Sequence, residues 1–303
     1  GATGQMGPQL AERMSMAQIT NTLLIDEIDE NAGTIVAKNA YGMFIGTSEN
    51  GTKTPTIQND GRIVVEGQGA GFELGGAGVK GIGINNGTIT VGEVFDKAED
   101  KWAHGVLINV ANQTFTNNGT INATAEGTSA IEVKDDANNT ALKFGAKSDV
   151  NGLVHLAAGN TTLTFDGTVD TMKIKTENGV TALLDLQNKA NLTLEDGLKS
   201  TYETVTLDDS RLNASIWGDD NTFKTVTVNE GNIFNITKLN SRVDLKSDAD
   251  LPKDQLLIAR DQSFTYDHAQ MHVAGKVFTG NLKVGTLDQK GTVTLKGGEH
   301  NFS

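Results

Sequence analysis

The sequence lacks cysteine and contains few prolines and few aromatic residues. Its 303 residues include no Cys, 3 Pro and 5% aromatic side chains. Without cysteine the chain can have neither a disulfide framework nor a thiol nucleophile. Large aromatic side chains usually fill much of a thick globular core. Their scarcity therefore favours a thin core, one side chain deep, that is repeated along an axis and filled by Ile, Val, Leu, Ala and Thr.

The lack of long apolar runs and the shortage of basic residues limit the partners that we expect for the chain. No apolar run approaches the roughly 18 residues that a membrane-spanning helix requires, so we expect no membrane insertion of this fragment. Basic residues are outnumbered, and the formal net charge is −13 at pH 7. A surface of this charge repels nucleic-acid phosphates and anionic lipid, so we expect no nucleic-acid partner.

Glycine, in contrast, is abundant, and a short phrase recurs around four of the 35 glycines. The phrase, Asn-x-Gly followed by Thr or Arg and then Ile, occupies residues 31–35, 59–63, 85–89 and 117–121. Its glycines are 28, 26 and 32 residues apart. A period of this length is too long for a hairpin repeat and fits one turn of a solenoid with variable loops.

Each repeat contains two further short apolar segments, so a turn would hold three strands. Gly and Asn suit the corners between them, because both tolerate left-handed backbone conformations with positive φ. Asn side chains stacked from turn to turn can also hydrogen-bond in a ladder. The pattern predicts an all-β fold, a right-handed parallel β-helix that forms a three-sided solenoid with terminal caps. The segments after the phrase are Gly42–Ile45, Gly71–Leu74, Gly105–Ile108 and Ala130–Val133, and those that complete each turn are Thr56–Ile57, Gly83–Ile84, Thr114–Phe115 and Leu142–Phe144.

A β-sandwich with Asn-Gly hairpins is the alternative fold, because Asn-Gly between strands is a strong hairpin signal. The nearly regular spacing and the scarcity of proline favour the solenoid. We expect its rungs over residues 29–240, although after about residue 145 only the alternation of apolar and polar residues persists. Residues 1–28, with a helical pattern over 9–18, are predicted to form an N-terminal cap or leader segment. Residues 241–303, where Pro252 interrupts pairing, are predicted to form irregular C-terminal rungs and a cap.

The longest interruption of the repeat lies in its third copy and is acidic. The gap from Gly87 to Gly105, which contains it, is about twice the matching gap from Gly33 to Gly42, and the interruption ends on a tryptophan. A loop of this kind projects from the coil, and function often resides on such loops. The alternative is a solvated insertion in which Trp102 folds back as a packing anchor. The candidate binding residues are Glu93, Asp96, Glu99, Asp100, Lys101 and Trp102.

No constellation for catalysis or metal binding is visible in the sequence. Adjacent acids occur at 135–136, 208–209 and 219–220, but neighbouring residues on a strand point to opposite faces and cannot form the facing carboxylate pair of a glycosidase. The five histidines are scattered, and the spacing of His268 and His272 does not converge on a metal in strand or loop. Nucleophile elbows and phosphate loops are missing. We predict no enzyme, no catalytic residues, no cofactor and no bound metal.

Several features of the repeat resemble those of a known family. They are the run Gly81–Thr90, the phrase at 117–122 and the later Thr-Leu-Thr pattern, while the tail at 254–259 is similar to a capping segment. Over roughly residues 29–240 the chain resembles the passenger domains of bacterial autotransporters, the proteins of type V secretion. The resemblance implies export from a Gram-negative cell and a translocating β-barrel downstream in the full-length protein. It also implies an extracellular location, either anchored at the outer-membrane surface or secreted.

The leading functional hypothesis is a cell-surface adhesin that acts in adhesion, biofilm formation or virulence. Its partners would be copies of itself on neighbouring cells, or a host glycan or matrix protein. Contact would involve a solenoid flank and protruding loops, where weak hydrogen bonds of about 0.5–1.5 kcal/mol each can sum. A carbohydrate-active β-helix enzyme, either a polysaccharide lyase or a hydrolase, is one alternative, and an inert structural spacer is another.

Overall fold

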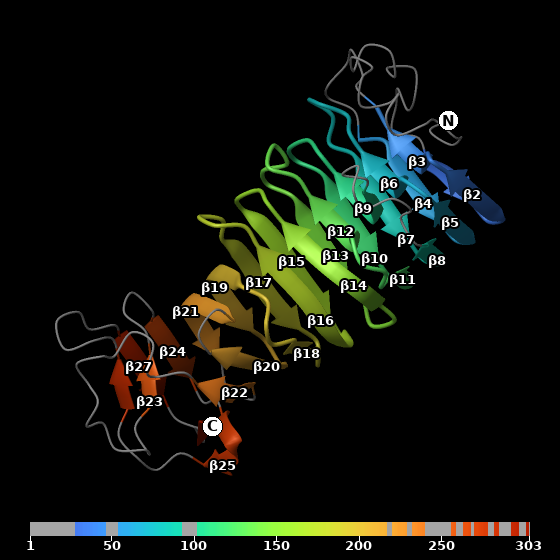
Figure 1. Cartoon of the computed structure of the whole chain (residues 1–303). Helices are drawn as coiled ribbons and strands as arrows, with labels where there is room; N and C mark the ends of the chain where they lie inside the picture. The colour runs from blue at the N-terminus through green and yellow to red at the C-terminus, as the bar shows by residue number, and fades with distance from the viewer. Residues whose placement is uncertain are drawn as a thin grey trace. The chain divides into compact units, whose positions relative to one another are not determined.

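The computed structural model describes residues 28–46, 54–92, 102–216, 220–228 and 232–239, and beyond them the strands β23 to β28. All regular structure in these residues is β-strand, and the strands pair in parallel except for the last one, β28. The structure confirms the predicted all-β fold, a parallel β-helix (Figure 1). The predicted N-terminal helix lies outside the described residues. The chain divides into two compact units, the first containing residues up to Leu163 together with Glu177–Val180, and the second containing the rest.

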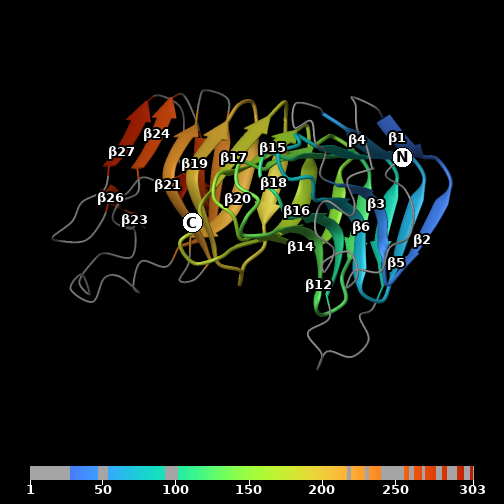
Figure 2. The same cartoon turned by 90° about the horizontal axis from the view of Figure 1, so that it is seen from above.

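The first unit has three strands in each turn, as predicted, and they stack into three sheets (Figure 2). The first sheet contains the strands that end on the first Asn of each phrase, and the second sheet contains the strands that begin after the Gly. The third sheet completes each turn. The first sheet consists of β1 (Ile28–Asn31), β4 (Thr56–Asn59), β7 (Ile82–Asn85), β10 (Thr114–Asn117) and β13 (Ala141–Phe144); the second of β2 (Thr34–Lys38), β5 (Arg62–Glu66), β8 (Thr88–Val91), β11 (Thr120–Ala123) and the start of β14 (Asp149–Leu156); the third of β3 (Tyr41–Ile45), β6 (Gly69–Leu74), β9 (Ala103–Ile108), β12 (Thr128–Val133) and the end of β14.

The core of this unit is built from columns of apolar side chains in register. In the second sheet the isoleucines of the phrase pair from turn to turn, and Ile63, Ile89 and Ile121 are fully buried. The threonines beside them, Thr88 and Thr120, are only partly buried and face outward, because side chains alternate along a strand. The core is therefore one side chain deep, as the shortage of aromatic residues suggested.

The first asparagine of each phrase forms the predicted ladder. The side-chain amide of Asn31 donates to that of Asn59 at 2.9 Å, Asn59 donates to Asn85 at 3.0 Å, and Asn85 donates to Asn117 at 2.9 Å. The last step ends on the Ser148 hydroxyl, 2.8 Å from the Asn117 amide nitrogen. Asn59, Asn85 and Asn117 are fully buried, so these bonds satisfy polar groups that water cannot reach.

Three of the four glycines of the phrase are required for a reason other than the one predicted. Positive φ is found at other corners, for example at Asn39, Asn112 and Gly67, whereas Gly61, Gly87 and Gly119 lack it. Instead, a Cβ at these three positions would lie 2.0 to 2.2 Å from the carbonyl oxygen of the corresponding glycine one turn earlier. The corners stack so closely that only a residue without a side chain fits, which corrects the prediction of left-handed glycines here.

The second unit differs from the predicted three-sided coil because its complete turns hold two strands each. A turn is correspondingly shorter, and stacked partners such as Asn191 and Asn213 are 22 residues apart. Its core contains aromatic residues in contact with each other, with Tyr202 stacked on Phe223 at 5.3 Å and Phe223 edge-on to Phe234. One sheet contains β17 (Ala182–Gln187), β19 (Ser200–Leu207), β21 (Asn221–Val228), β24 (Ser263–Asp267) and β27 (Thr292–Lys296); the other contains β16 (Val169–Thr176), β18 (Asn191–Leu194), β20 (Arg211–Ile216), β22 (Ile233–Leu239), β25 (Gln270–Val277) and β28 (Asn301–Phe302).

Three further strands complete the description. β15 (Thr161–Asp166) contains the boundary between the two units. β23 (Leu256–Ile258) and β26 (Leu282–Val284) form a separate parallel pair within the segment predicted as irregular rungs and cap. No helix in the described part of the chain is long and apolar enough to cross a membrane.

Candidate functional site

Of the six candidate binding residues in the acidic loop, only Trp102 lies among the described residues. Its backbone carbonyl accepts a hydrogen bond from the Gly69 N–H at 3.1 Å. Its ring stacks on Tyr41 and, nearly parallel, on His104, with centroids 6.4 and 5.2 Å away. What is described of this residue therefore matches the packing-anchor alternative. Glu93, Asp96, Glu99, Asp100 and Lys101 lie outside the described residues, so a binding role for the loop stays a prediction.

Trp102 packs on the outer face of the third sheet, where an apolar cluster lies outside the main core. Tyr41, Ala70 and His104 occupy the same register position on three neighbouring strands. Because Ala70 is small, it leaves room between the rings of Tyr41 and His104. Trp102 packs against the cluster that includes Ala70 and Leu107. The cluster consists of Tyr41, Phe44, Ala70 and Leu107, all buried.

Replacing Trp102 with alanine is expected to lower the free energy of unfolding by about 2 kcal/mol, roughly half the cost of truncating a fully buried tryptophan, because Trp102 is only half-buried. Lys134 provides a matched control, since its Nζ lies 5.7 Å from the centroid of the Trp102 ring. Lys134→Ala removes this contact alone and should cost about 1 kcal/mol or less. Urea titrations followed by circular dichroism compare the two variants. Equal losses would mean that Trp102 contributes nothing beyond the cation–π contact.

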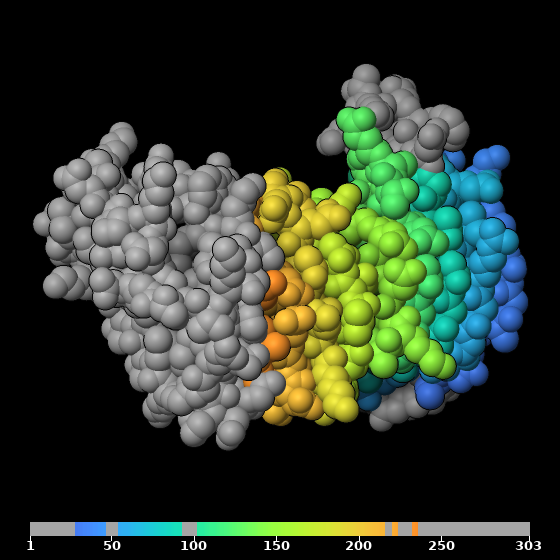
Figure 3. All heavy atoms as spheres, turned by 90° about the horizontal axis from the view of Figure 1, so that it is seen from below, coloured from blue at the N-terminus to red at the C-terminus, as the bar shows by residue number. Residues whose placement is uncertain are grey.

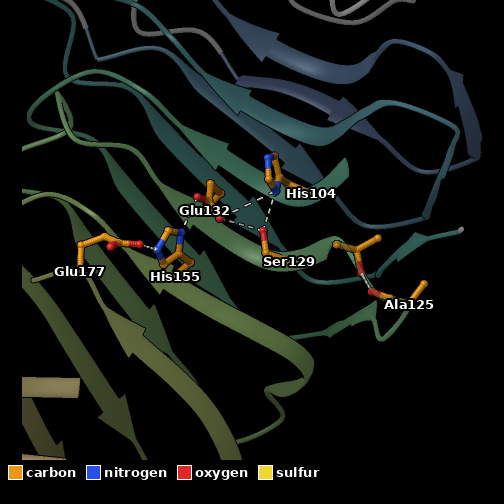
Figure 4. A network of polar contacts seen from close by, with 7 residues as sticks. His104, Ala125, Ser129, Glu132, His155 and Glu177 are labelled. Atoms are coloured by element: carbon orange, nitrogen blue, oxygen red, sulfur yellow. Dashed lines mark hydrogen bonds and ion pairs between the residues drawn. The ribbon is translucent and has the colours of Figure 1, made fainter. Parts of the chain in front are cut away.

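A chain of polar side chains begins at His104, which stacks on Trp102, and continues to Glu177 (Figure 4). His104 is on β9, Ser129 and Glu132 are on β12, and His155 is on β14. Glu177 belongs to a turn that is part of the first compact unit, and its backbone N–H donates to the Leu156 carbonyl at 3.0 Å. The network thus links side chains from four successive segments of the coil through the outer face of the third sheet.

The hydrogen bonds of this network have one consistent direction. Ser129 Oγ donates its single proton to Glu132 Oε2 at 3.1 Å, so His104 Nδ1, 2.5 Å away, acts as the donor to Ser129. His155 lies between two carboxylates, with Nδ1 2.6 Å from Glu132 Oε1 and Nε2 2.5 Å from Glu177 Oε1. Both carboxylates can only accept, so both ring nitrogens of His155 hold protons and the ring is positively charged.

The two histidines titrate in opposite directions because their surroundings differ. Burial lowers the pKa of His104 to about 4, although the Glu132 carboxylate partly opposes this and Lys134 adds to it. The hydrogen bond to Glu132 raises the pKa of His155 above its ordinary value, with help from Glu177 and against the effect of burial. The surroundings therefore favour a neutral His104 and a protonated His155.

The pH dependence of stability should reveal the His155 bridge. A folded-state pKa above 6.5 means that the bridge contributes fully below about pH 6.5 and that its contribution is lost as pH rises through the raised pKa. The difference in unfolding free energy between the wild type and His155→Asn should therefore be largest near pH 6 and shrink toward about pH 9. Urea unfolding at several pH values measures it, and a difference that stays constant across this range would contradict the bridge.

His104 should affect the same pH dependence of stability on its acid side. Below about pH 6.5 the unfolded chain binds a proton that the folded chain accepts only near pH 4, so stability falls as the pH is lowered between these values. A His104→Asn variant should weaken this acid-side loss and leave the alkaline loss due to His155 in place. The two variants together separate the two histidines.

Sequence reasoning missed this network, although one signal was available. The segments Gly105–Ile108 and Ala130–Val133 occupy matching positions in their repeats, and this alignment already places His104 next to Ser129. The histidines were instead considered for metal binding. In the described residues no group of three or more His, Asp or Glu side chains is arranged to hold a metal ion. His268 lies outside the described residues, as does the side chain of His272.

The network contains a serine and a histidine, the residue types of a nucleophile and its base, but their contacts are those of a structural network. Ser129 and His104 are 3% and 7% exposed, and the serine proton is directed at Glu132. The His155 side chain fills the space between Glu132 and Glu177, where two catalytic carboxylates of a glycosidase would need to face a substrate. The arrangement joins neighbouring turns by charge-assisted hydrogen bonds.

Comparison of the chain with protein-family models, curated proteins and solved structures finds no match in any of the three.

Proposed function

We propose that this chain is an adhesin, the surface-displayed passenger of a bacterial autotransporter, and that it binds copies of itself or a host glycan or matrix protein through one flank of the solenoid. The autotransporter part of the proposal is supported by the parallel β-helix and the repeated phrase. The binding part is supported by one observation, the regular arrangement of polar side chains on the outer face of the second sheet. This flank, defined by Thr88, Thr90, Thr120, Asn122 and Asn151, is called the threonine–asparagine face below.

The threonine–asparagine face repeats the same chemistry from turn to turn. Thr88 pairs in register with Thr120, and Thr90 with Asn122, which in turn pairs with Asn151. The Asn151 side-chain amide donates to Asn122 at 2.9 Å, so neighbouring turns hold each other's side chains in place. The five residues are partly exposed. Figure 3 shows the successive turns of the first unit as adjacent bands of atoms that reach the surface.

Such a face suits binding by many equivalent contacts. Strands in a sheet are about 4.8 Å apart, so donors and acceptors recur at that interval along the flank. Each hydrogen bond adds only about 0.5–1.5 kcal/mol, but a rigid row of them loses little conformational entropy when a partner binds. Because β8, β11 and β14 each expose part of the pattern, a long polymer or a second solenoid can engage three turns at once.

The proposal is tested by displaying the chain on the surface of a non-adherent bacterium and measuring cell clumping and binding to glycans and matrix proteins. A Thr120→Glu variant alters the threonine–asparagine face, and Thr116→Glu is its matched control. Thr116 lies on β10 of the same turn and is also partly exposed, but on the first sheet. We expect clumping or binding by the wild type, its loss in Thr120→Glu, and its retention in Thr116→Glu. No clumping and no binding by the wild type would contradict the adhesin, and release of reducing sugar from a glycan would favour an enzyme.

A further inference from the structure

The chain contains Asn-Gly dipeptides, which are sites of a spontaneous backbone reaction. The glycine nitrogen can attack the side-chain amide carbon of the preceding asparagine, because glycine has no Cβ to obstruct the approach. The described residues contain four such dipeptides, at 86–87, 118–119, 151–152 and 178–179. The reaction needs a free asparagine amide and a backbone that can rotate, so hydrogen bonding at each dipeptide decides which of the four can react.

Two of the four dipeptides, at 86–87 and 118–119, are held by hydrogen bonds and close packing in a corner of the first unit. The Asn86 side-chain amide donates to Asp60 Oδ1 at 2.8 Å, and its oxygen accepts a bond from Asn118 at 3.0 Å. The Gly87 N–H, which would have to attack, donates to the Asn59 carbonyl at 3.0 Å. A Cβ on Gly87 or Gly119 would overlap the preceding turn, so these backbones have no room to rotate.

The third dipeptide is held within a strand. Asn151 donates its side-chain amide to Asn122 at 2.9 Å, and it lies within β14, where it pairs in register with the same residue. Gly152 is similarly confined, because a Cβ there would lie 2.3 Å from the Ala123 carbonyl oxygen. Three of the four dipeptides are therefore immobilised by contacts with a neighbouring turn.

The fourth dipeptide is free of such contacts. Asn178 and Gly179 are exposed, and they form the centre of a turn closed by one hydrogen bond, from the Val180 N–H to the Glu177 carbonyl at 3.0 Å. Gly179 has a φ of +78°, and no heavy atom would lie within 4 Å of a Cβ placed on it. The Asn178 side chain makes no hydrogen bond to the described residues, so its amide carbon can reach the Gly179 nitrogen.

We propose that Asn178 is a site of spontaneous deamidation in the folded protein, and that Asn86, Asn118 and Asn151 are protected from the same reaction. The Gly179 nitrogen forms a bond to the Asn178 side-chain carbon, the bond from that carbon to Nδ2 breaks, and ammonia leaves with the proton that the Gly179 nitrogen loses. Water then opens the cyclic imide to aspartate or isoaspartate. The reaction exchanges ammonia for water without oxidation or reduction.

The product places a new negative charge beside the polar network described above. Residue 178 follows Glu177, whose carboxylate accepts the proton of His155 Nε2. An isoaspartate would also lengthen the main chain of this turn by one carbon atom. Deamidation would therefore alter the one turn that ends the network and leave the stacked corners unchanged.

Mass spectrometry of peptides from the full chain, aged at 37 °C and mildly alkaline pH, tests the proposal with an internal control. In the folded chain the conversion of Asn178 should exceed that of Asn118 at least about tenfold, the factor that corresponds to roughly one lost hydrogen bond. In the same chain unfolded in urea, the two sites should react at similar rates. Comparable conversion of Asn118 and Asn178 in the folded chain would overturn the proposal, as would the absence of conversion at Asn178 when the unfolded chain reacts.

A variant separates this site from any other source of charge heterogeneity. Asn178→Gln retains an amide, but its longer side chain would need to form a larger and less favourable ring. The variant should lose the acidic form that accumulates in the aged wild type, as measured by ion-exchange chromatography. If the acidic form accumulates equally in the variant, its source is another residue and the assignment to Asn178 is wrong.

Discussion

A Gly87→Ala substitution is expected to lower the free energy of unfolding by about 3 kcal/mol or to prevent folding altogether. The added Cβ would lie 2.0 Å from the Gly61 carbonyl oxygen, far inside the contact distance of the two atoms. That oxygen also accepts the Thr88 N–H at 2.9 Å, so moving it away would break a hydrogen bond between turns. The strain cannot be relieved by a side-chain rotation, because both partners are backbone or directly attached to it.

Gly33 provides the matched control, since it occupies the same position in the first copy of the phrase. A Cβ there would meet no described atom closer than 4.0 Å. Gly33→Ala should therefore stay within about 1 kcal/mol of the wild type. Urea unfolding followed by far-ultraviolet circular dichroism measures both variants. If Gly33→Ala is as damaging as Gly87→Ala, the glycines serve some purpose other than close stacking.

An Asn85→Leu substitution is expected to cost about 3 kcal/mol, because it breaks the hydrogen bonds that Asn85 makes with three residues and leaves the buried Asn117 Oδ1 without its donor. Asn85 accepts from the amide of Asn59 and donates to the oxygen of Asn117, and both neighbours are fully buried. It also donates to the Thr120 carbonyl at 3.2 Å. Leucine has a similar volume, so the loss would come from the missing hydrogen bonds and not from a cavity.

The end of the same ladder supplies the control for this second substitution. Asn31 is only partly buried, and its removal takes one of two donors from Asn59 Oδ1, which still accepts the Gly61 N–H at 3.2 Å. Asn31→Leu should therefore cost about 1 kcal/mol, the usual net value of one hydrogen bond. The comparison uses the midpoint and slope of urea unfolding. Equal costs at both positions would show that the interior of the ladder is no more important than its end.

The fold of the first unit was predictable because one phrase determines several features at once. The Asn of the phrase predicted the hydrogen-bonded ladder. Its Ile forms the buried column, and the spacing between copies predicted the length of a turn. The reason for the glycines was predicted wrongly, because close approach of two backbones depends on how corners stack and a single repeat shows only its own residues. In the second unit the alternation of apolar and polar residues indicates strands, and Asn191–Leu194 is one of them, but alternation alone does not say how many strands form a turn.

The candidate site was much less predictable than the fold. No other copy of the repeat has the same residue type as His104, Ser129 or His155 at the matching position, and Glu132 shares its position only with Glu73, so periodicity does not distinguish these residues from other surface residues. Their contact depends on the register of the third sheet, where Glu132 pairs with His155. The sequence indicated the acidic loop instead, because an interruption of the repeat can be recognised in the amino-acid sequence. A side-chain network between turns cannot be recognised there.

The corner of the first unit contains two rows of amides that point in opposite directions. In the buried row, Asn31, Asn59 and Asn85 all donate toward the C-terminus. In the neighbouring exposed row, Asn118 donates to Asn86 and Asn86 to Asp60, toward the N-terminus. An α-helix aligns its amides and accumulates partial charge at its ends. The side-chain amides of this corner point in both directions instead, so their dipoles partly cancel, and the stack accumulates less charge at its ends than one aligned row of amides would.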